Sequence, residues 1–169
     1  MPLTMTTPTE LTIEVRRFFA APRALIWRAY TDPGLVPRWL TGPEGHTMPI
    51  CEMDVRVGGA FRWVWEFPDG NRMEATGTYS VVETERRLVN SEGFDFAPGS
   101  STHVETLLED APGGTNLIQT MTYDSQATRD AVLKTPMDQG MEASFARLDG
   151  MLGSLHNATD DAASCDNAD

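Results

Sequence analysis

The chain has 169 residues, of which 40% are hydrophobic and 22% charged, a composition typical of one globular domain with a sizeable core. Its formal net charge of -12 argues against a nucleic-acid partner, because such binding relies on clustered Lys and Arg. No apolar run approaches the ~20 residues of a membrane span and the N-terminus lacks a secretory signal, so we expect a cytoplasmic protein without membrane insertion.

The first 40 residues predict one strand followed by two short helices. Alternation of apolar residues indicates the strand, and Pro22 suits the first turn of the first helix. Asp32 can cap the second helix, and Gly42 followed by Pro43 ends it. The predicted elements are, in order, a flexible N-terminus (1–9), a strand (10–19), a helix (22–30) and a second helix (33–40).

The middle of the chain predicts a meandering antiparallel sheet, because short alternating segments are separated by Gly, Pro and Asp turns. The clearest alternation places Phe61, Trp63, Trp65 and Phe67 on one face of a strand. Together with the first strand, the six segments expected here should form a sheet of about seven strands. The six expected here are 48–57, 60–67, 72–83, 87–94, 102–109 and 115–123.

The C-terminal part predicts a short helix capped by Ser125 and then a separate long helix. Thr135 as N-cap and Pro136 at the first helical position favour a fresh start there. The long helix carries an apolar stripe from Met137 to Leu155, which needs a large apolar partner surface. Residues 10–156 are therefore expected to form one domain, followed by a disordered acidic tail at 157–169.

Four runs of the sequence carry a resemblance to a known family. They are YTDPGLVPRWLTGPEG, TMPICEMDVRVGGAFRWVW, GTYSVVETERRLVNSEGFD and TRDAVLKTPMDQGM. Together they resemble bacterial AHSA-type proteins, akin to activators of the ninety-kilodalton heat-shock chaperone ATPase, in the START and birch-pollen-allergen-like (SRPBCC) superfamily. The resemblance covers about residues 10 to 155. It implies an α+β helix-grip fold, with a curved antiparallel sheet wrapped around the long C-terminal helix and two short helices closing one end.

The resemblance also implies an apolar cavity between the sheet and the long helix. The alternative is that the same side chains fill an ordinary core. The residues expected to line the cavity are Trp39, Met48, Phe61, Trp63, Trp65, Met73, Met121, Met141 and Phe145. Those expected to form a lid over it are Leu35, Val36 and His46.

The sequence offers little machinery for catalysis. His46, His103 and His156 do not form a metal-binding motif, and no nucleophile signature is present, so we expect no metal and no cofactor. The remaining candidates are groups for general acid–base catalysis in the cavity. They are Glu92, and the pair His103 and Glu105, which share one strand face. If that face points outward, His103 and Glu105 are surface residues, which we favour.

Three functions follow from these expectations. The first is binding of a small apolar or amphipathic molecule in the cavity. The second is a cavity enzyme of the cyclase or dehydratase kind that works by acid–base catalysis. The third is activation of a chaperone ATPase, which is weakened because the chain has no room for the additional N-terminal domain of the eukaryotic activators. The resemblance also allows a homodimer.

Overall fold

The structure is a computed structural model, which describes the backbone of residues 2–165 and the side chains of residues 2–155. Its strands are β1 (Thr4–Thr6), β2 (Thr12–Phe19), β3 (Thr47–Met53), β4 (Ala60–Glu66), β5 (Arg72–Glu83), β6 (Arg87–Phe94), β7 (Thr102–Ala111) and β8 (Gly114–Thr122). Its helices are α1 (Arg23–Thr31), α2 (Val36–Trp39), α3 (Gln126–Leu133) and α4 (Met137–Cys165).

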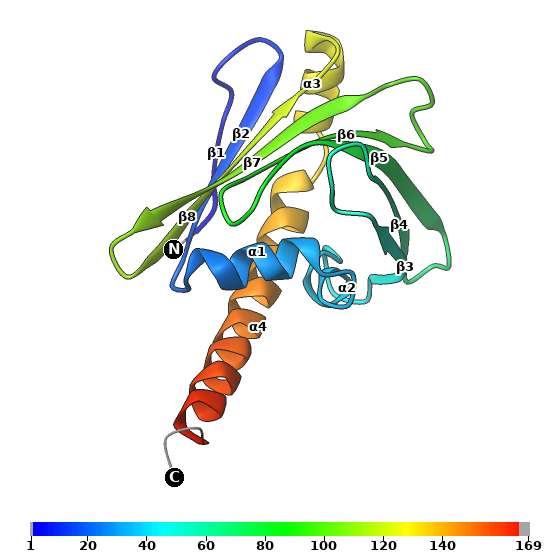
Figure 1. Cartoon of the computed structure of the whole chain (residues 1–169). Coiled ribbons are helices and arrows are strands. Elements are labelled where there is room, and N and C mark those ends of the chain that lie inside the picture. Colours follow the sequence, from blue (N-terminus) through cyan, green and yellow to red (C-terminus); the bar gives the residue numbers. More distant parts are fainter. Residues whose placement is uncertain (1, 166–169) are drawn as a thin grey trace.

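The eight strands form one antiparallel sheet in the order β1-β2-β8-β7-β6-β5-β4-β3. The sheet curves, and α4 runs beneath its concave face with α1 and α2 beside it (Figure 1). Consecutive strands from β3 to β8 are neighbours, as expected for a meander, and β2 closes on β8. The predicted α+β helix-grip fold is therefore confirmed. In the part of the chain that the structure describes, no helix is both long and apolar enough to cross a membrane.

The sheet has one strand more than predicted, because β1 lies inside the segment that we expected to be flexible. Thr4 pairs with Arg16 of β2, and Thr6 pairs with Glu14. The Leu3 backbone N–H also donates to the Glu142 carboxylate of α4, at 3.0 Å. Three residues are too few to show a strand period, so this strand is held by contacts that lie far away in sequence.

Two helix starts differ from the prediction. The Asp32 carboxylate accepts a hydrogen bond from the Gly34 N–H at 2.8 Å and its carbonyl accepts from the Val36 N–H at 3.0 Å, as a helix cap does, but the residues between form a turn and α2 begins only at Val36. The Thr135 hydroxyl donates to the Val132 carbonyl at 2.7 Å and belongs to the end of α3, so it does not cap α4. The predicted cap of α3 is confirmed, because the Ser125 hydroxyl accepts from the Thr128 N–H at 3.1 Å.

Helix α4 runs to Cys165, past residue 156, where we predicted that order would end. The stretch 157–165 contains no Gly or Pro, and its alanines have the highest helix propensity, so nothing local stops the helix. The remaining residues of the predicted tail, 166–169, and the side chain of His156 lie outside the described residues.

The apolar stripe of α4 packs under one half of the sheet. Phe145, Leu148 and Leu152 are almost fully buried in a cluster with Ile13 of β2 and Leu117 of β8. The other half of the sheet, β3 to β6, forms two smaller apolar clusters of its own. The space between these clusters is where the site lies.

Candidate functional site

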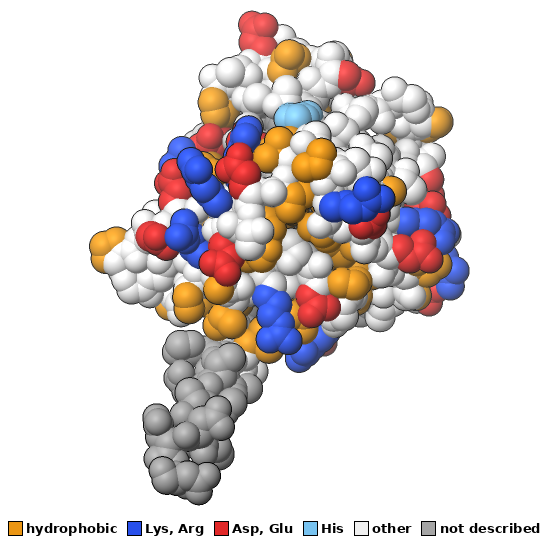
Figure 2. All heavy atoms as spheres, viewed as in Figure 1, with side chains coloured by type: hydrophobic (Ala, Val, Ile, Leu, Met, Phe, Trp, Pro, Cys, Tyr) orange, Lys and Arg blue, Asp and Glu red, His pale blue; other side chains and the backbone are white. Residues whose placement is uncertain are grey.

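A cavity of about 380 Å³ lies between the concave face of the sheet, the α2 segment and α4. This volume falls in the range of small-molecule sites, about 300–1,000 Å³. Most of its wall is aromatic, aliphatic or methionine side chains. On the surface, hydrophobic side chains gather near the middle of the face viewed in Figure 1, with charged side chains around them (Figure 2). The arrangement suits an apolar or amphipathic molecule.

Trp39 is a fixed part of the cavity wall. Only 1% of it is exposed, and its Nε1–H donates to the Ala29 carbonyl of α1 at 3.0 Å. Its ring lies 4.7 Å from that of Tyr30 and stacks on Phe145 of α4, with the centroids 6.3 Å apart. The tryptophan on this short helix is therefore held by both longer helices, deep in the wall.

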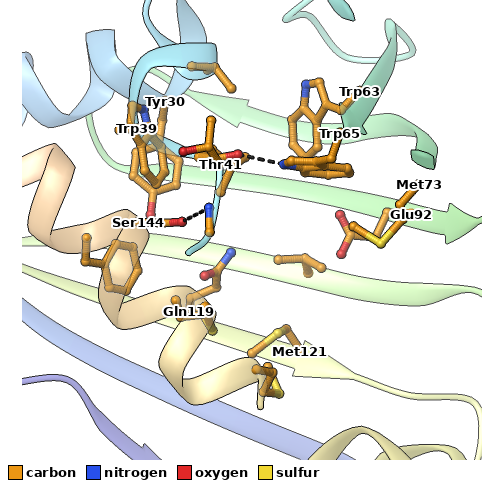
Figure 3. Close-up of a pocket in the computed structure, with 18 of the residues that line it drawn as sticks. Tyr30, Trp39, Thr41, Trp63, Trp65, Met73, Glu92, Gln119, Met121 and Ser144 are labelled. Atoms are coloured by element: carbon orange, nitrogen blue, oxygen red, sulfur yellow. Dashed lines mark hydrogen bonds between the residues drawn. The ribbon is translucent and has the colours of Figure 1, made fainter. Parts of the chain in front are cut away.

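The segment after α2 is attached to both the sheet and α4. The Trp65 Nε1–H donates to the Leu40 carbonyl at 2.7 Å, and the Gly42 N–H donates to the Ser144 hydroxyl at 2.9 Å (Figure 3). Arg147 donates to the Gly42 carbonyl from the next turn of α4. These three bonds fix the wall of the cavity between sheet and helix.

Most residues expected to line the cavity do so, and two do not. Met48 lies on β3 beside a register shift between Thr47 and Ile50, which breaks the alternation, and its side chain packs into a cluster with Trp65. Phe61 stacks on Trp63 with the ring centroids 4.3 Å apart and is buried in a separate cluster. The predicted residues that line the cavity are Trp39, Trp63, Trp65, Met73, Met121, Met141 and Phe145.

Of the three residues expected to form a lid, Val36 and His46 line the cavity and Leu35 does not. Leu35 lies just before α2 and packs into the main core instead. The His46 ring meets the Phe67 ring edge-on at 5.0 Å, and its Nδ1 lies 3.0 Å from the Pro43 carbonyl oxygen. Pro43 is exposed and also lines the cavity, so the cavity reaches solvent there.

Polar groups gather on the sheet side of the cavity. Glu92 of β6 points inward beside Met73 (Figure 3). Burial raises the pKa of the Glu92 carboxyl to about 7, and the nearby Asn90 amide partly opposes this shift. No hydrogen bond of good geometry joins the two side chains, since the buried Nδ2 of Asn90 has no partner among the described residues. The hydroxyl of Tyr79 and the Nε1 of Trp63 are also buried without a partner there.

The other two acid–base candidates lie outside the cavity. His103 is exposed, and the Glu105 carboxylate pairs with Arg87 at 2.5 Å. Both residues lie on the convex face, since Val104 between them is buried. Of the three candidates, only Glu92 therefore lies where a bound molecule could reach it.

The cavity contains one acidic side chain and no fixed positive charge. Among the described residues that line it, Glu92 is the only acid, His46 is the only base, and none is Lys or Arg. In the part of the chain that the structure describes, no group of three or more His, Cys, Asp or Glu side chains is placed to hold a metal ion.

Sequence reasoning missed the polar part of the wall. Tyr79, Asn90, Thr106 and Gln119 all line the cavity. The signal was present in part, because Asn90 and Glu92 share a strand parity, as do Tyr79 and Met73 on β5. Without the cross-strand register, in which Tyr79 lies opposite Asn90, this shared parity did not indicate that the residues form one site.

Comparison with known proteins agrees with this architecture. Residues 20–153 match the model of the family "Activator of Hsp90 ATPase homolog 1-like protein". A crystal structure of a Rhodobacter sphaeroides protein is 34% identical, with a TM-score of 0.86, and the match covers 91% of this chain and 99% of that one. Protein Ms6760 from Mycobacterium smegmatis is 25% identical, with a TM-score of 0.79 and coverage of 89% and 97%.

Protein NE0264 from Nitrosomonas europaea shares the fold at 23% identity, with a TM-score of 0.79 and coverage of 89% and 99%. Among curated proteins, no match was found. The family match spans most of the chain and coincides with the elements that enclose the cavity. The chain thus belongs to the family of proteins like activator of Hsp90 ATPase homolog 1.

Proposed function

We propose that the chain binds a small, mainly apolar molecule in the cavity between the sheet and α4. The observation that carries this proposal is the cavity itself, about 380 Å³ with an apolar wall. A dry void of that size would cost about 9 kcal/mol at ~24 cal/mol per Å³. This rivals the whole stability of a domain, ~5–15 kcal/mol, so the cavity must be occupied by water or by a ligand.

The wall favours a ligand over water. Water in a cavity needs two to four polar partners, and most of the side chains that line this one are apolar. Trp39, Trp65 and Phe145 contribute aromatic rings to the wall, and its methionines contribute flexible thioethers, which adapt to ligands of differing shape. Removing an apolar ligand from water against such a wall is favourable.

The test is native mass spectrometry of the protein purified from its host, followed by extraction of whatever is bound. Gln119→Trp places a large ring in the cavity from β8, whereas Thr120→Trp on the same strand adds the same ring on the convex face. We expect a defined small molecule in the wild type and in Thr120→Trp, and none in Gln119→Trp. Equal occupancy in the two variants would contradict binding in this cavity.

A second candidate, acid–base catalysis, is favoured by one observation, the position of Glu92. Its carboxyl lies inside the cavity, and a pKa of about 7 suits proton transfer near neutral pH. The same test decides it. If the bound molecule is converted by the wild type and left unchanged by Glu92→Gln, the chain is an enzyme, whereas recovery of one unchanged molecule from both supports binding alone.

A further inference from the structure

We propose that Tyr79, Asn90 and Glu92 form a polar recognition subsite for an uncharged ligand that carries a carbonyl-type oxygen next to an O–H or N–H group. This inference rests on the proposed function, because it assigns a ligand class to the same cavity. The three residues will be called the polar subsite.

The sheet register brings the polar subsite together. Tyr79 of β5 and Asn90 of β6 lie directly opposite each other, and Glu92 follows two residues later on the same face. Side chains in such positions lie within about 5–8 Å of one another. The register between β5 and β6 shifts just after Tyr79, and such irregularities are frequent next to functional sites.

Two members of the polar subsite lack hydrogen-bond partners. Tyr79 is 2% exposed and Asn90 6%, yet the Tyr79 hydroxyl and the Asn90 Nδ2 meet no partner among the described residues. Buried polar groups without partners are rare and unfavourable. Both atoms can donate a hydrogen bond, and both residues line the cavity, so an acceptor oxygen of a ligand would satisfy them.

Glu92 supplies the complementary group. Its side chain points into the cavity next to Met73 (Figure 3), and the Asn90 Nδ2 beside it does not reach it in good hydrogen-bond geometry. When ionised, a carboxylate only accepts, so it would take the O–H or N–H of the ligand. One acceptor and one donor side by side on the ligand would therefore satisfy all three residues.

The charges of the groups that line the cavity exclude anionic and cationic ligands. A carboxylate ligand would face Glu92 with no described Lys or Arg on the wall to neutralise it. A protonated amine would pair with Glu92 but would offer no acceptor to Tyr79 and Asn90. The neutral class is the one that leaves no polar group of the subsite unpaired.

The test compares four probes with the same apolar scaffold: naphthalene, 2-naphthamide, 2-naphthoate and protonated 2-naphthylmethylamine. Dissociation constants are measured at pH 8 by tryptophan fluorescence. 2-Naphthamide carries the carbonyl oxygen and the N–H that the polar subsite requires. We expect it to bind about tenfold more tightly than naphthalene, from two net hydrogen bonds, and more tightly than either ionic probe.

Two variants isolate the polar subsite. Tyr79→Phe removes only a hydroxyl, so it should weaken the binding of 2-naphthamide about fivefold and leave the binding of naphthalene unchanged. Tyr123→Phe is the matched control, since Tyr123 is also buried but does not line the cavity. Glu92→Gln keeps an acceptor and removes the charge. It should therefore lower the dissociation constant of 2-naphthoate about tenfold and change that of 2-naphthamide less than threefold.

The outcomes separate this inference from the proposed function. If naphthalene and 2-naphthamide bind equally, or if 2-naphthoate or the amine binds most tightly, the polar subsite is overturned while cavity binding stands. If none of the four probes binds, both proposals fall. Selective binding of 2-naphthamide that Tyr79→Phe weakens about fivefold and Tyr123→Phe leaves unchanged supports both.

Discussion

At the scale of single residues, Glu92 gives the cavity its pH dependence. Burial raises its pKa in the folded protein to about 7, above the ordinary value of 4.5. The folded state therefore prefers the protonated carboxyl, and the stability that this preference contributes is fully present below about pH 4.5. That contribution is lost as the pH rises through 7, because the buried carboxylate must then ionise.

We expect Glu92→Gln to remove this dependence. Chemical denaturation of both proteins gives the difference in their unfolding free energies at pH 5 and again at pH 8, and contributions common to both proteins cancel. Relative to the variant, the wild type should lose on the order of 2 kcal/mol between pH 5 and pH 8. A difference that stays constant with pH would mean that Glu92 is solvated.

Gly77 provides a second test at this scale. A Cβ added there would lie 2.1 Å from the Ser91 carbonyl oxygen and 2.4 Å from the Phe61 ring, so Gly77→Ala should cost about 2 kcal/mol. Gly150 of α4 has no atom within 4 Å of such a Cβ, and Gly150→Ala should stabilise by up to about 1 kcal/mol. Thermal denaturation of the two variants compares their melting temperatures, and equal shifts would contradict the close packing of β4 and β6 around Gly77 of β5.

At the scale of elements, Arg17 joins β2 to α4. Its guanidinium, 6% exposed, donates to Glu142 and to Asp149, each at 2.5 Å, on two turns of the helix. The same Glu142 accepts from the Leu3 N–H before β1. One buried cation thus ties together the helix and the two strands at this edge of the sheet.

Arg17→Met should therefore destabilise the protein by about 2 kcal/mol, because it leaves two carboxylates without their cation. Arg16→Met is the matched control, since the Arg16 side chain is exposed and its guanidinium forms an ion pair with Glu14 on its own strand. It should change stability by less than about 0.5 kcal/mol. Denaturant unfolding measures both, and similar losses would show that the link between β2 and α4 contributes little.

The sequence predicted the elements whose signals are local and missed those that depend on distant contacts. Alternation placed β5 and β6 at their observed bounds, and the apolar stripe identified α4. Strand β1 is too short to show a period and depends on pairing with β2. The Asp32 cap was predicted, but the three residues after it form a turn, so α2 begins at Val36 and not at 33.

At the scale of the whole molecule, the cavity exists because α4 packs under one half of the sheet only. The family resemblance predicted its place and most of its apolar wall. Its volume and its polar side could not be predicted, since both depend on the register of β5 with β6 and on the bonds that hold the segment around Gly42. Because the register of the strands could not be predicted, Met48 and Phe61 were expected to line the wall, which they do not.

Binding of an apolar molecule in this cavity can be followed residue by residue with methionine methyl NMR. In protein labelled at the ¹³C-methyl groups, addition of naphthalene should shift the signals of Met73, Met121 and Met141, which line the cavity. The signals of Met5 and Met151, which do not line it, should stay in place. Shifts confined to Met5 or Met151, or no shifts at all, would contradict the account.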